Sequence, residues 1–236
     1  MALLEVRNVT AGYGEVQILW DANLALEPGK LTALVGSNGA GKTTMLRAVM
    51  GLIRPWQGQV TFQGQDVSKL SAHSKAEMGL ALVPEGRQLF TDMTVAENLE
   101  MGASPKHARA NVRANLERVY ATFPRLKERA AQRSGTLSGG EQQMLAVARG
   151  IMAQPTILMV DEMSLGLAPV LALDLFKALR QLRKEGLTIL LVEQNVQMAL
   201  QVSDYAYVFS EGRTTLHGPA REIAANEDVR KAYLGL

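Results

Sequence analysis

The pattern of hydrophobic and polar positions predicts a strand, a loop and a helix in the first fifty residues. Residues 3–9 alternate between apolar and polar side chains, and residues 31–35 form a short apolar run that ends at a glycine-rich loop. Residues 42–50 then place apolar side chains at helical spacing. Gly51, with Pro55 just beyond it, is typical of the C-terminus of such a helix.

Three later apolar runs predict further strands. Residues 80–83, 156–160 and 187–192 are too short for buried helices and too continuous for strands with one side in water. We therefore expect them to be interior strands of a parallel sheet. An amphipathic helix predicted over 170–185, which Gly186 closes, continues the strand–helix–strand order and indicates an α/β core.

The rest of the chain divides into a helical stretch and a mixed C-terminal part. Residues 95–149 have a mostly helical pattern that two prolines and a glycine interrupt, and we interpret them as a helical insertion. Turn signals at 211–212 and 218–219 predict a pair of strands followed by helices that end at Leu234.

The composition narrows the class of protein. With 236 residues, 47% hydrophobic and 20% charged, the chain fits one ordinary globular unit. A net charge of +2 gives no reason to expect a nucleic acid partner, and the absence of cysteine excludes disulfides and thiolate metal sites. The sequence has neither a secretory leader pattern nor a run of about 18 apolar residues, so we expect any membrane role to act through a partner.

Residues 36–43 match the phosphate-binding pattern G-x-x-x-x-G-K-[ST] between a predicted strand and a predicted helix. Backbone N–H groups of such a loop point at phosphate oxygens, Lys42 would reach the β- and γ-phosphates, and Thr43 would offer its hydroxyl to Mg²⁺. A purely structural glycine loop is the alternative. The predicted nucleotide-binding residues of this loop are Gly36, Ser37, Asn38, Gly39, Ala40, Gly41, Lys42, Thr43 and Thr44.

Two acidic residues follow the apolar run at 157–160. Asp161 and Glu162 stand at the carboxyl end of a predicted parallel strand, the edge at which such sheets bind ligands. Asp161 would hold Mg²⁺, and Glu162 would orient or deprotonate the attacking water. Taken alone, such a pair is often only the N-cap region of a helix, but the phosphate loop favours the catalytic interpretation.

A third motif, Leu-Ser-Gly-Gly-Glu-Gln-Gln, occupies residues 137–143. Ser138 can cap a helix that runs to Ala153, and the glycine pair lets a phosphate approach the first N–H groups of that helix. A simple capped helix is the alternative, which leaves the glycine pair without a reason. The predicted nucleotide-binding residues here are Ser138, Gly139, Gly140 and Glu141.

Together the three motifs resemble the ABC ATPases over residues 4–236. The resemblance implies ATP and Mg²⁺ as cofactors and a P-loop ABC ATPase fold: a mixed, mostly parallel sheet with an antiparallel β region and an inserted helical subdomain. It places the nucleotide-binding core at about 1–88 and 155–236 of a single domain and the helical subdomain at about 89–154. It further implies that two such subunits pair head to tail. The third motif, residues 137–143, is the signature of the family, and in such a pair the signature of each subunit closes over ATP held by the phosphate loop of the other.

Three residues stand at positions where the family has a characteristic type of side chain. Tyr13 stands where the family has an aromatic residue stacked on adenine, although a packing role in a β-hairpin is the alternative. Most members have Gln and His where this chain has Glu85 and Gln194. Glu85 can bind Mg²⁺ or hold water, whereas Gln194 can donate a hydrogen bond to the γ-phosphate but cannot carry a proton. The predicted catalytic residues are thus Glu162, Lys42, Glu85 and Gln194, and the predicted metal ligands are Thr43, Asp161 and Glu85.

Several segments are similar to the ATPases of bacterial branched-chain amino acid importers: residues 83–87, 164–169, 192–195 and 232–236. This resemblance implies a peripheral subunit at the cytoplasmic face of the inner membrane. Its partners would be a second ATPase, identical or related, two permease chains and, indirectly, a periplasmic binding protein. A urea or short-chain amide importer, a soluble ABC ATPase, and a hydrolysis-dead protein suggested by Gln194 are the alternatives.

Overall fold

The computed structural model describes residues 2–234 and is built around a six-stranded sheet in the order β10-β9-β3-β8-β7-β6. All neighbouring strands are parallel except β10, which runs antiparallel to β9. The sheet consists of β3 (Leu31–Val35), β6 (Leu80–Val83), β7 (Ile157–Asp161), β8 (Thr188–Glu193), β9 (Tyr205–Ser210) and β10 (Arg213–Pro219). The predicted mixed, mostly parallel sheet is confirmed.

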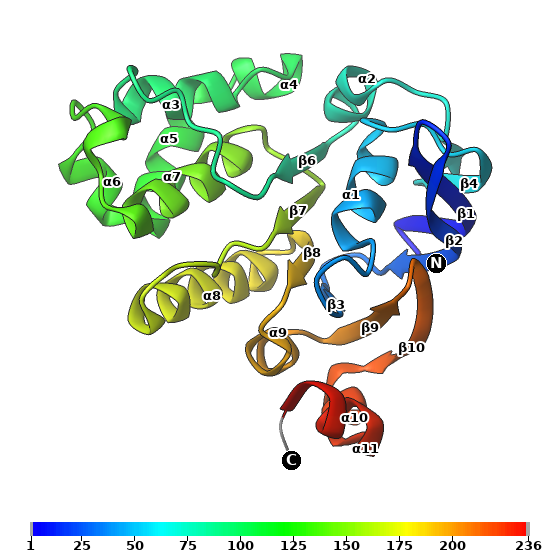
Figure 1. Ribbon diagram of the computed structural model, residues 1–236. Helices are drawn as coiled ribbons and strands as arrows, with labels where there is room; N and C mark the ends of the chain where they lie inside the picture. The colour runs from blue at the N-terminus through cyan, green and yellow to red at the C-terminus, as the bar shows by residue number, and fades with distance from the viewer. Residues whose placement is uncertain (1, 235–236) are drawn as a thin grey trace.

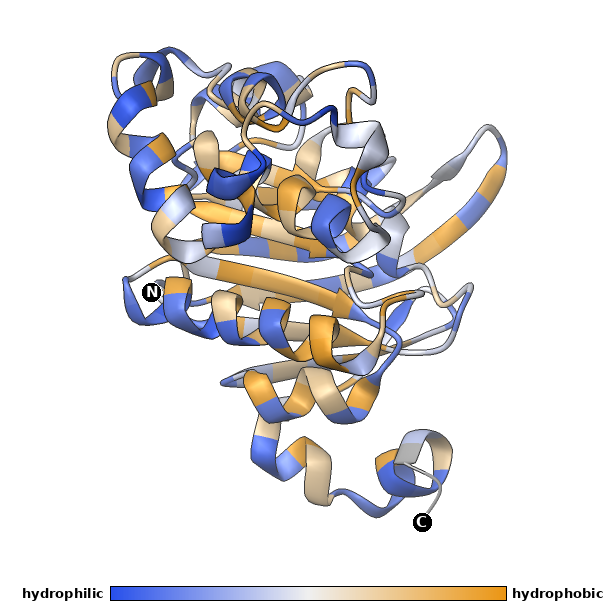
Figure 2. Cartoon of the chain, turned by 90° about the vertical axis from the view of Figure 1, so that its left-hand side faces the viewer, coloured by the Kyte–Doolittle hydropathy of each residue, from blue (hydrophilic) through white to orange (hydrophobic). Residues whose placement is uncertain are grey.

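Alternate side chains of these strands enter two different hydrophobic cores. In β3, Leu31, Ala33 and Val35 pack into the core that contains the helices of residues 95–184, whereas Leu34 packs into the core on the opposite face. Because successive side chains of a strand point to opposite faces, a strand buried on both faces must be apolar throughout. This requirement explains the continuous apolar runs. Figure 2 shows these runs as largely hydrophobic strands, with helices of mixed hydrophobic and hydrophilic segments on either side.

The prediction of interior strands is correct for β7 and β8 and wrong for β6. β6 lies at the edge of the sheet and pairs only with β7. Its faces are nevertheless covered. The helix α7 (Gly139–Met152) packs against it from the helical part of the chain, and α1 (Lys42–Met50) and α2 (Ala72–Glu77) pack against it as well. An apolar run therefore indicates that both faces of a strand are buried. It does not indicate whether the strand has neighbours on one side or on both sides.

A second, antiparallel sheet has the order β2-β1-β4-β5 and confirms the antiparallel region. It comprises β1 (Leu4–Tyr13), β2 (Val16–Leu26), β4 (Gln57–Phe62) and β5 (Gln65–Asp66). The helix α1 (Lys42–Met50), whose bounds were predicted, lies between the two sheets, and its Met45, Leu46 and Val49 share one core with both (Figure 1).

The helical pattern predicted over 95–149 is also confirmed. These helices gather beyond the β6–β7 edge of the sheet (Figure 1). They are α3 (Val95–Gly102), α4 (Lys106–Arg109), α5 (Val112–Thr122), α6 (Pro124–Glu128) and α7 (Gly139–Met152), with a 3₁₀ turn at Ser134–Thr136. The proposed division of the chain into a core and a helical subdomain at about 89–154 stays a prediction.

The remaining helices cover the sheet and complete the C-terminal part. They are α2 (Ala72–Glu77), α8 (Pro169–Lys184), α9 (Val196–Val202), α10 (Ala220–Ala225) and α11 (Glu227–Val229), followed by a π-helical turn at Arg230–Leu234. Among the described residues, no helix combines the length and the apolar composition needed to cross a bilayer. Gly235 and Leu236, part of the ending used for the resemblance, lie outside the described residues.

Candidate nucleotide site

The phosphate loop connects β3 to α1 and is fixed by the β9–β10 end of the sheet. Gly36 has a φ of 157°, and a Cβ atom there would lie 2.2 Å from the carbonyl oxygen of Phe209, so only glycine fits. Further along the loop, the N–H of Gly212 donates to the carbonyl of Ala40 at 2.9 Å. Contacts with β9 and with the turn before β10 therefore fix the path of the loop near its start and near its end.

Lys42 is buried at the start of α1, with its ammonium group inside the curl of the loop. Its Nζ donates to the carbonyl oxygens of Gly36 at 2.9 Å and Ser37 at 3.0 Å. The N-cap residue of α1, Gly41, has no side chain with which to cap the helix. The N–H groups of the first turn and the lysine thus face the same place, an arrangement that suits an anion.

Asp161 ends β7 and is almost completely buried. Burial raises the pKa of Asp161 to about 6, against the opposing effect of the neighbouring Thr43 hydroxyl. Its buried Oδ1 has no hydrogen-bond partner within residues 2–234, which is costly for a carboxylate oxygen. An oxygen left in this state, next to a hydroxyl, fits the preference of Mg²⁺ for hard oxygen ligands.

The donor set also agrees with Mg²⁺ rather than with an all-protein metal cage. In the described part of the chain, no group of three or more His, Cys, Asp or Glu residues is placed to hold a metal. Mg²⁺ usually keeps several waters and binds through one or two carboxylates together with substrate phosphates. Asp161 and Thr43 therefore fit that ion as a partial ligand set.

Glu162 has its carboxylate between Lys42 and Gln194. One oxygen, Oε1, lies 3.5 Å from Nζ of Lys42, and the other, Oε2, accepts a 2.7 Å hydrogen bond from Nε2 of Gln194. The backbone of Glu162 has a φ of 47°, unusual for a non-glycine residue, and its N–H donates to the carbonyl of Val192. The structure thus brings together three of the four predicted catalytic residues.

Glu85, the fourth, lies on the exposed turn that follows β6. It shares a cavity of about 530 Å³ with Thr43 and Asp161, so all three predicted metal ligands face one space. The turn is fastened to α7, since Arg149 donates to the carbonyl of Gln88 at 2.8 Å. Arg149 was not predicted as a site residue, and its only signal in the sequence is a basic residue in the apolar second half of α7.

Two further residues next to the site were missed. The carboxylate of Glu193, 1% exposed, accepts hydrogen bonds from Ser164 at 2.6 Å (Oγ) and 3.0 Å (N). Burial raises the pKa of Glu193 to about 7, although both hydrogen bonds act in the opposite direction. The contact ties the end of β8 to the loop that follows Glu162, and an acidic residue directly after an apolar run was the available signal.

Tyr13 ends β1 with 41% of its surface exposed. Its hydroxyl accepts a 3.0 Å hydrogen bond from Arg47 of α1, whose guanidinium lies 5.9 Å from the ring centroid. A ring this exposed does not fill the hydrophobic core, which weakens the packing alternative. Its role toward adenine stays a prediction.

The signature motif begins α7 with a complete capping box. The backbone N–H and Oγ of Ser138 both donate to the carboxylate of Glu141, and the N–H of Glu141 donates back to Oγ. Added Cβ atoms would lie 3.1 Å from Nη2 of Arg87 at Gly139 and 2.3 Å from Cδ1 of Leu171 at Gly140. Packing against Leu171 therefore favours glycine at position 140, whereas at position 139 the neighbour is the movable end of an arginine side chain.

The signature and the phosphate loop are not joined within one chain. Among the hydrogen bonds of residues 2–234, none connects residues 138–141 to residues 36–44. The capped start of α7 is confirmed, whereas the nucleotide contact of these residues stays a prediction.

Comparison with known proteins identifies the family. The structure has the fold of a nucleotide-free ATP-binding cassette from an ABC transporter, with a TM-score of 0.86, 24% identity and complete coverage of both chains. The pattern of the family described as ABC transporter matches residues 19–164, so the chain belongs to the ABC transporter family, as an ATP-binding ATPase.

Two curated relatives cover nearly the whole chain. The high-affinity branched-chain amino acid transport ATP-binding protein BraG of Pseudomonas aeruginosa is 41% identical over 233 residues, which are 99% of this chain and 100% of that protein. The lipopolysaccharide export system ATP-binding protein LptB of Haemophilus influenzae is 30% identical over 241 residues, with 100% and 98% covered. The predicted resemblance to ABC ATPases and to their branched-chain amino acid branch is confirmed.

Proposed function

We propose that this chain energises an importer of branched-chain amino acids as a peripheral subunit at the cytoplasmic face of the inner membrane. The observation that carries this proposal is the full-length similarity to BraG, which exceeds the similarity to LptB. Two permease chains would form the pathway, and a periplasmic binding protein would deliver leucine, isoleucine or valine to it.

In this proposal the phosphate loop binds the triphosphate of ATP. The N–H groups at the start of α1 hold its oxygens, and the Lys42 ammonium turns from the carbonyls of Gly36 and Ser37 toward the β- and γ-phosphates. Tyr13 stacks on the adenine ring from the end of β1.

Mg²⁺, when bound, neutralises the negative charge that the phosphates share during transfer. Thr43, Asp161 and Glu85 would hold it, since all three face the same cavity and Asp161 contributes an oxygen without a partner. Binding a cation would also keep the Asp161 carboxylate ionised in spite of its burial.

Hydrolysis needs a base for the attacking water, and Glu162 is placed for that role. Lys42 and Gln194 hold its two oxygens, so the carboxylate is oriented before reaction. Gln194 then has a second task, because its amide can also donate to the γ-phosphate. It cannot accept the proton, which leaves Glu162 as the proton acceptor.

Two copies of the ATPase, identical or related, complete the site in this proposal. Residues 138–141 of one subunit approach ATP held by the phosphate loop of the other, which agrees with the lack of hydrogen bonds between these residues and residues 36–44 within residues 2–234. The pair of ATPase subunits would close when ATP binds and open after hydrolysis, and this movement would drive the permease.

Uptake of radiolabelled leucine by native cells that lack this chain tests the cargo. We expect loss of uptake, restored by the wild-type chain and not by Glu162→Gln. The similarity to LptB makes lipopolysaccharide export the second candidate, and normal leucine uptake with a defective outer membrane would favour it. Uptake of labelled urea and acetamide in the same cells tests the short-chain amide alternative.

ATP turnover of the purified chain tests the site separately from the cargo. Glu162→Gln is expected to lower kcat by roughly 100-fold or more while ATP binding persists. Glu117→Gln, an exposed position on α5, is the matched control and should leave turnover unchanged. Near-normal turnover of Glu162→Gln would remove Glu162 from the catalytic role, and Lys42→Ala should weaken nucleotide binding first.

A further inference from the structure

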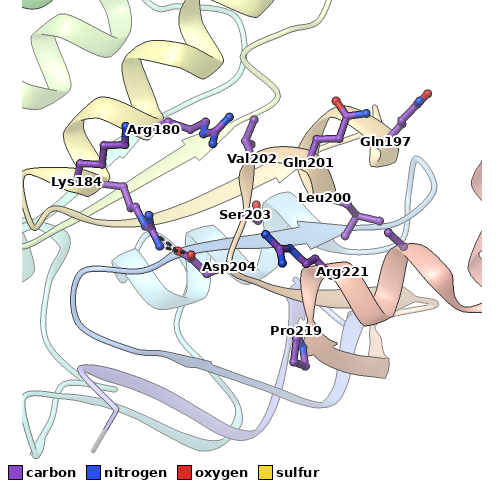
Figure 3. Close-up of a pocket in the computed structure, with 12 residues that line it drawn as sticks. Arg180, Lys184, Gln197, Leu200, Gln201, Val202, Ser203, Asp204, Pro219 and Arg221 are labelled. Carbon is purple, nitrogen blue, oxygen red and sulfur yellow. Dashed lines mark hydrogen bonds and ion pairs between the residues drawn. The ribbon is translucent and has the colours of Figure 1, made fainter.

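A second cavity, of about 680 Å³, lies between α8, α9 and the start of α10 (Figure 3). α8 contributes three cationic side chains to its lining, Arg180, Arg183 and Lys184, and α10 contributes Arg221. Among its described lining residues, Asp204 is the one acidic group. None of these residues belongs to the nucleotide site.

The charge of this lining is unbalanced. The carboxylate of Asp204 is already used, because it pairs with Arg183 and accepts a 2.9 Å hydrogen bond from the N–H of Leu31. Four cationic side chains against one carboxylate give the lining a net charge of +3, whereas the whole chain carries only +2. Positive charge is therefore concentrated here, and a concave surface strengthens the resulting field.

The three cations that remain are exposed and unpaired. The side chains of Arg180, Lys184 and Arg221 make no hydrogen bond or ion pair within residues 2–234. Arg180 and Lys184 stand one helical turn apart, and like charges at that spacing destabilise a helix. The dipole of α8 favours a cation in its last turn, but Arg221 stands in the first turn of α10, where a positive charge is unfavourable.

We propose that this cavity binds a small phosphate-bearing polyanion, which Arg180 and Lys184 contact from α8 and Arg221 contacts from α10. Arginine forks match the oxygens of phosphate groups, and an anion would relieve the repulsion among the three side chains. The buried Leu200 and the amide-bearing Gln201 also line the cavity (Figure 3).

The cavity is also connected to the nucleotide site. Gln197, in the first turn of α9, lines both this cavity and the one that contains Glu162 and Gln194. A ligand that joins α8 to α10 would restrain α9, the helix that directly follows Gln194. We therefore expect binding of the polyanion to change the rate of ATP turnover.

Calorimetric titration with tripolyphosphate tests the proposal. The protein carries Lys42→Ala, so that the phosphate loop does not dominate the signal. We expect one saturable site whose affinity falls at least about tenfold when Arg180→Gln and Arg221→Gln are added, because two charge-assisted contacts are lost. Lys184→Gln alone should give a smaller loss in the same direction.

The matched control removes the same charge elsewhere. Lys69→Gln with Arg113→Gln, both exposed and outside the cavity, should change the affinity less than twofold. Equal losses in the control and the cavity variants would overturn the proposal, because the binding would then reflect only overall charge. Thermal unfolding of each variant confirms that the compared proteins are folded.

Vesicles of phosphatidylglycerol distinguish the two sources of phosphate. Binding of soluble tripolyphosphate that needs Arg180 and Arg221 assigns the site to a soluble ligand. Vesicle binding with the same dependence, but without binding of tripolyphosphate, assigns it to a lipid headgroup. Binding of polyglutamate with neither phosphate probe overturns the proposal in favour of an acidic protein segment.

Discussion

Gln194 donates a 2.7 Å hydrogen bond from Nε2 to Oε2 of Glu162, and so links the ends of two neighbouring parallel strands, β8 and β7. The other oxygen of Glu162 lies 3.5 Å from Nζ of Lys42. The orientation of the proposed base therefore depends on a side chain that cannot itself exchange a proton at neutral pH.

Substitution of Gln194 by Ala is expected to lower kcat about 10- to 100-fold, because the carboxylate of Glu162 loses the donor that orients it. KM for ATP should change much less. Gln194→His, which keeps a donor, should recover part of the rate, and the distant Gln59→Ala should have no effect. Steady-state turnover over a range of ATP concentrations gives both constants, and an unchanged kcat in Gln194→Ala would contradict the positioning role.

Ser164 and Glu193 are expected to be energetically coupled. Both oxygens of the buried carboxylate accept from Ser164, so removing either side chain leaves a polar group without its partner. A double-mutant cycle with Ser164→Ala and Glu193→Gln should give a coupling of roughly 0.5–3 kcal/mol in the free energy of unfolding. Additive effects in urea titrations would show that the contact contributes little.

The free energy of unfolding is expected to depend on pH through the side chain of Lys75. It is fully buried on α2 and donates a 2.7 Å hydrogen bond to the carbonyl of Val49 near the end of α1. Burial lowers the pKa of Lys75 from 10.5 to about 8, so between these values the unfolded chain binds more protons than the native one. Stability from this group therefore rises with pH across that window, by roughly 1–3 kcal/mol.

The test is the difference in unfolding free energy between pH 7.5 and pH 10. Lys75→Met keeps the volume but removes the titrating group, so its stability should rise less with pH than that of the wild type. Lys69→Met, at an exposed position, should behave as the wild type does. Parallel curves for Lys75→Met and the wild type would show that the amine titrates normally.

Two glycines of the phosphate loop should differ in their tolerance of alanine. At Gly36 an added Cβ meets the Phe209 carbonyl at 2.2 Å, whereas at Gly39, with a φ of 78°, it meets nothing within 4 Å. Gly39→Ala should cost only the backbone strain of about 1–2 kcal/mol. Gly36→Ala must also displace β9, so it should unfold at lower urea and bind ATP more weakly; equal stabilities would contradict this.

Tyr13→Ala is expected to weaken ATP binding by roughly 5- to 150-fold, which corresponds to the 1–3 kcal/mol of base stacking. Tyr13→Phe keeps the ring and loses only the hydrogen bond from Arg47, so it should bind nearly as the wild type does. Fluorescence titration with a labelled ATP analogue measures both. A loss as large in Tyr13→Phe as in Tyr13→Ala would place the contribution in the hydroxyl group instead.

The sequence predicted those parts of the fold that depend on local pattern. The helix at 42–50 and the strands at 157–161 and 188–193 were recognisable because burial on both faces, or on one helical face, fixes their residue types. The strand β2 was not assigned, since much of one face is exposed and its pattern is irregular. The edge position of β6 could not be predicted, because strand order depends on contacts between distant segments.

The important polar residues can likewise be divided into those that the sequence predicts and those that it does not. Lys42, Asp161 and Glu162 stand in motifs whose spacing is itself the signal. Asn98, by contrast, is a buried residue of α3 that donates to the carbonyl of Phe90 and to the hydroxyl of Ser134. Such a residue looks in sequence like an ordinary polar helix position, and only the folded chain shows what it holds together.

The edge position of β6 has a mechanical consequence. Lys42, Glu162 and Gln194 follow β3, β7 and β8, each paired with strands on both sides, whereas Glu85 follows a strand paired on one side only. The helices of residues 95–152 join the sheet through β6 at one end and through β7 at the other. Glu85 thus stands on the less supported of these two strands, whereas the hydrolytic groups all follow strands that a neighbour holds on each side.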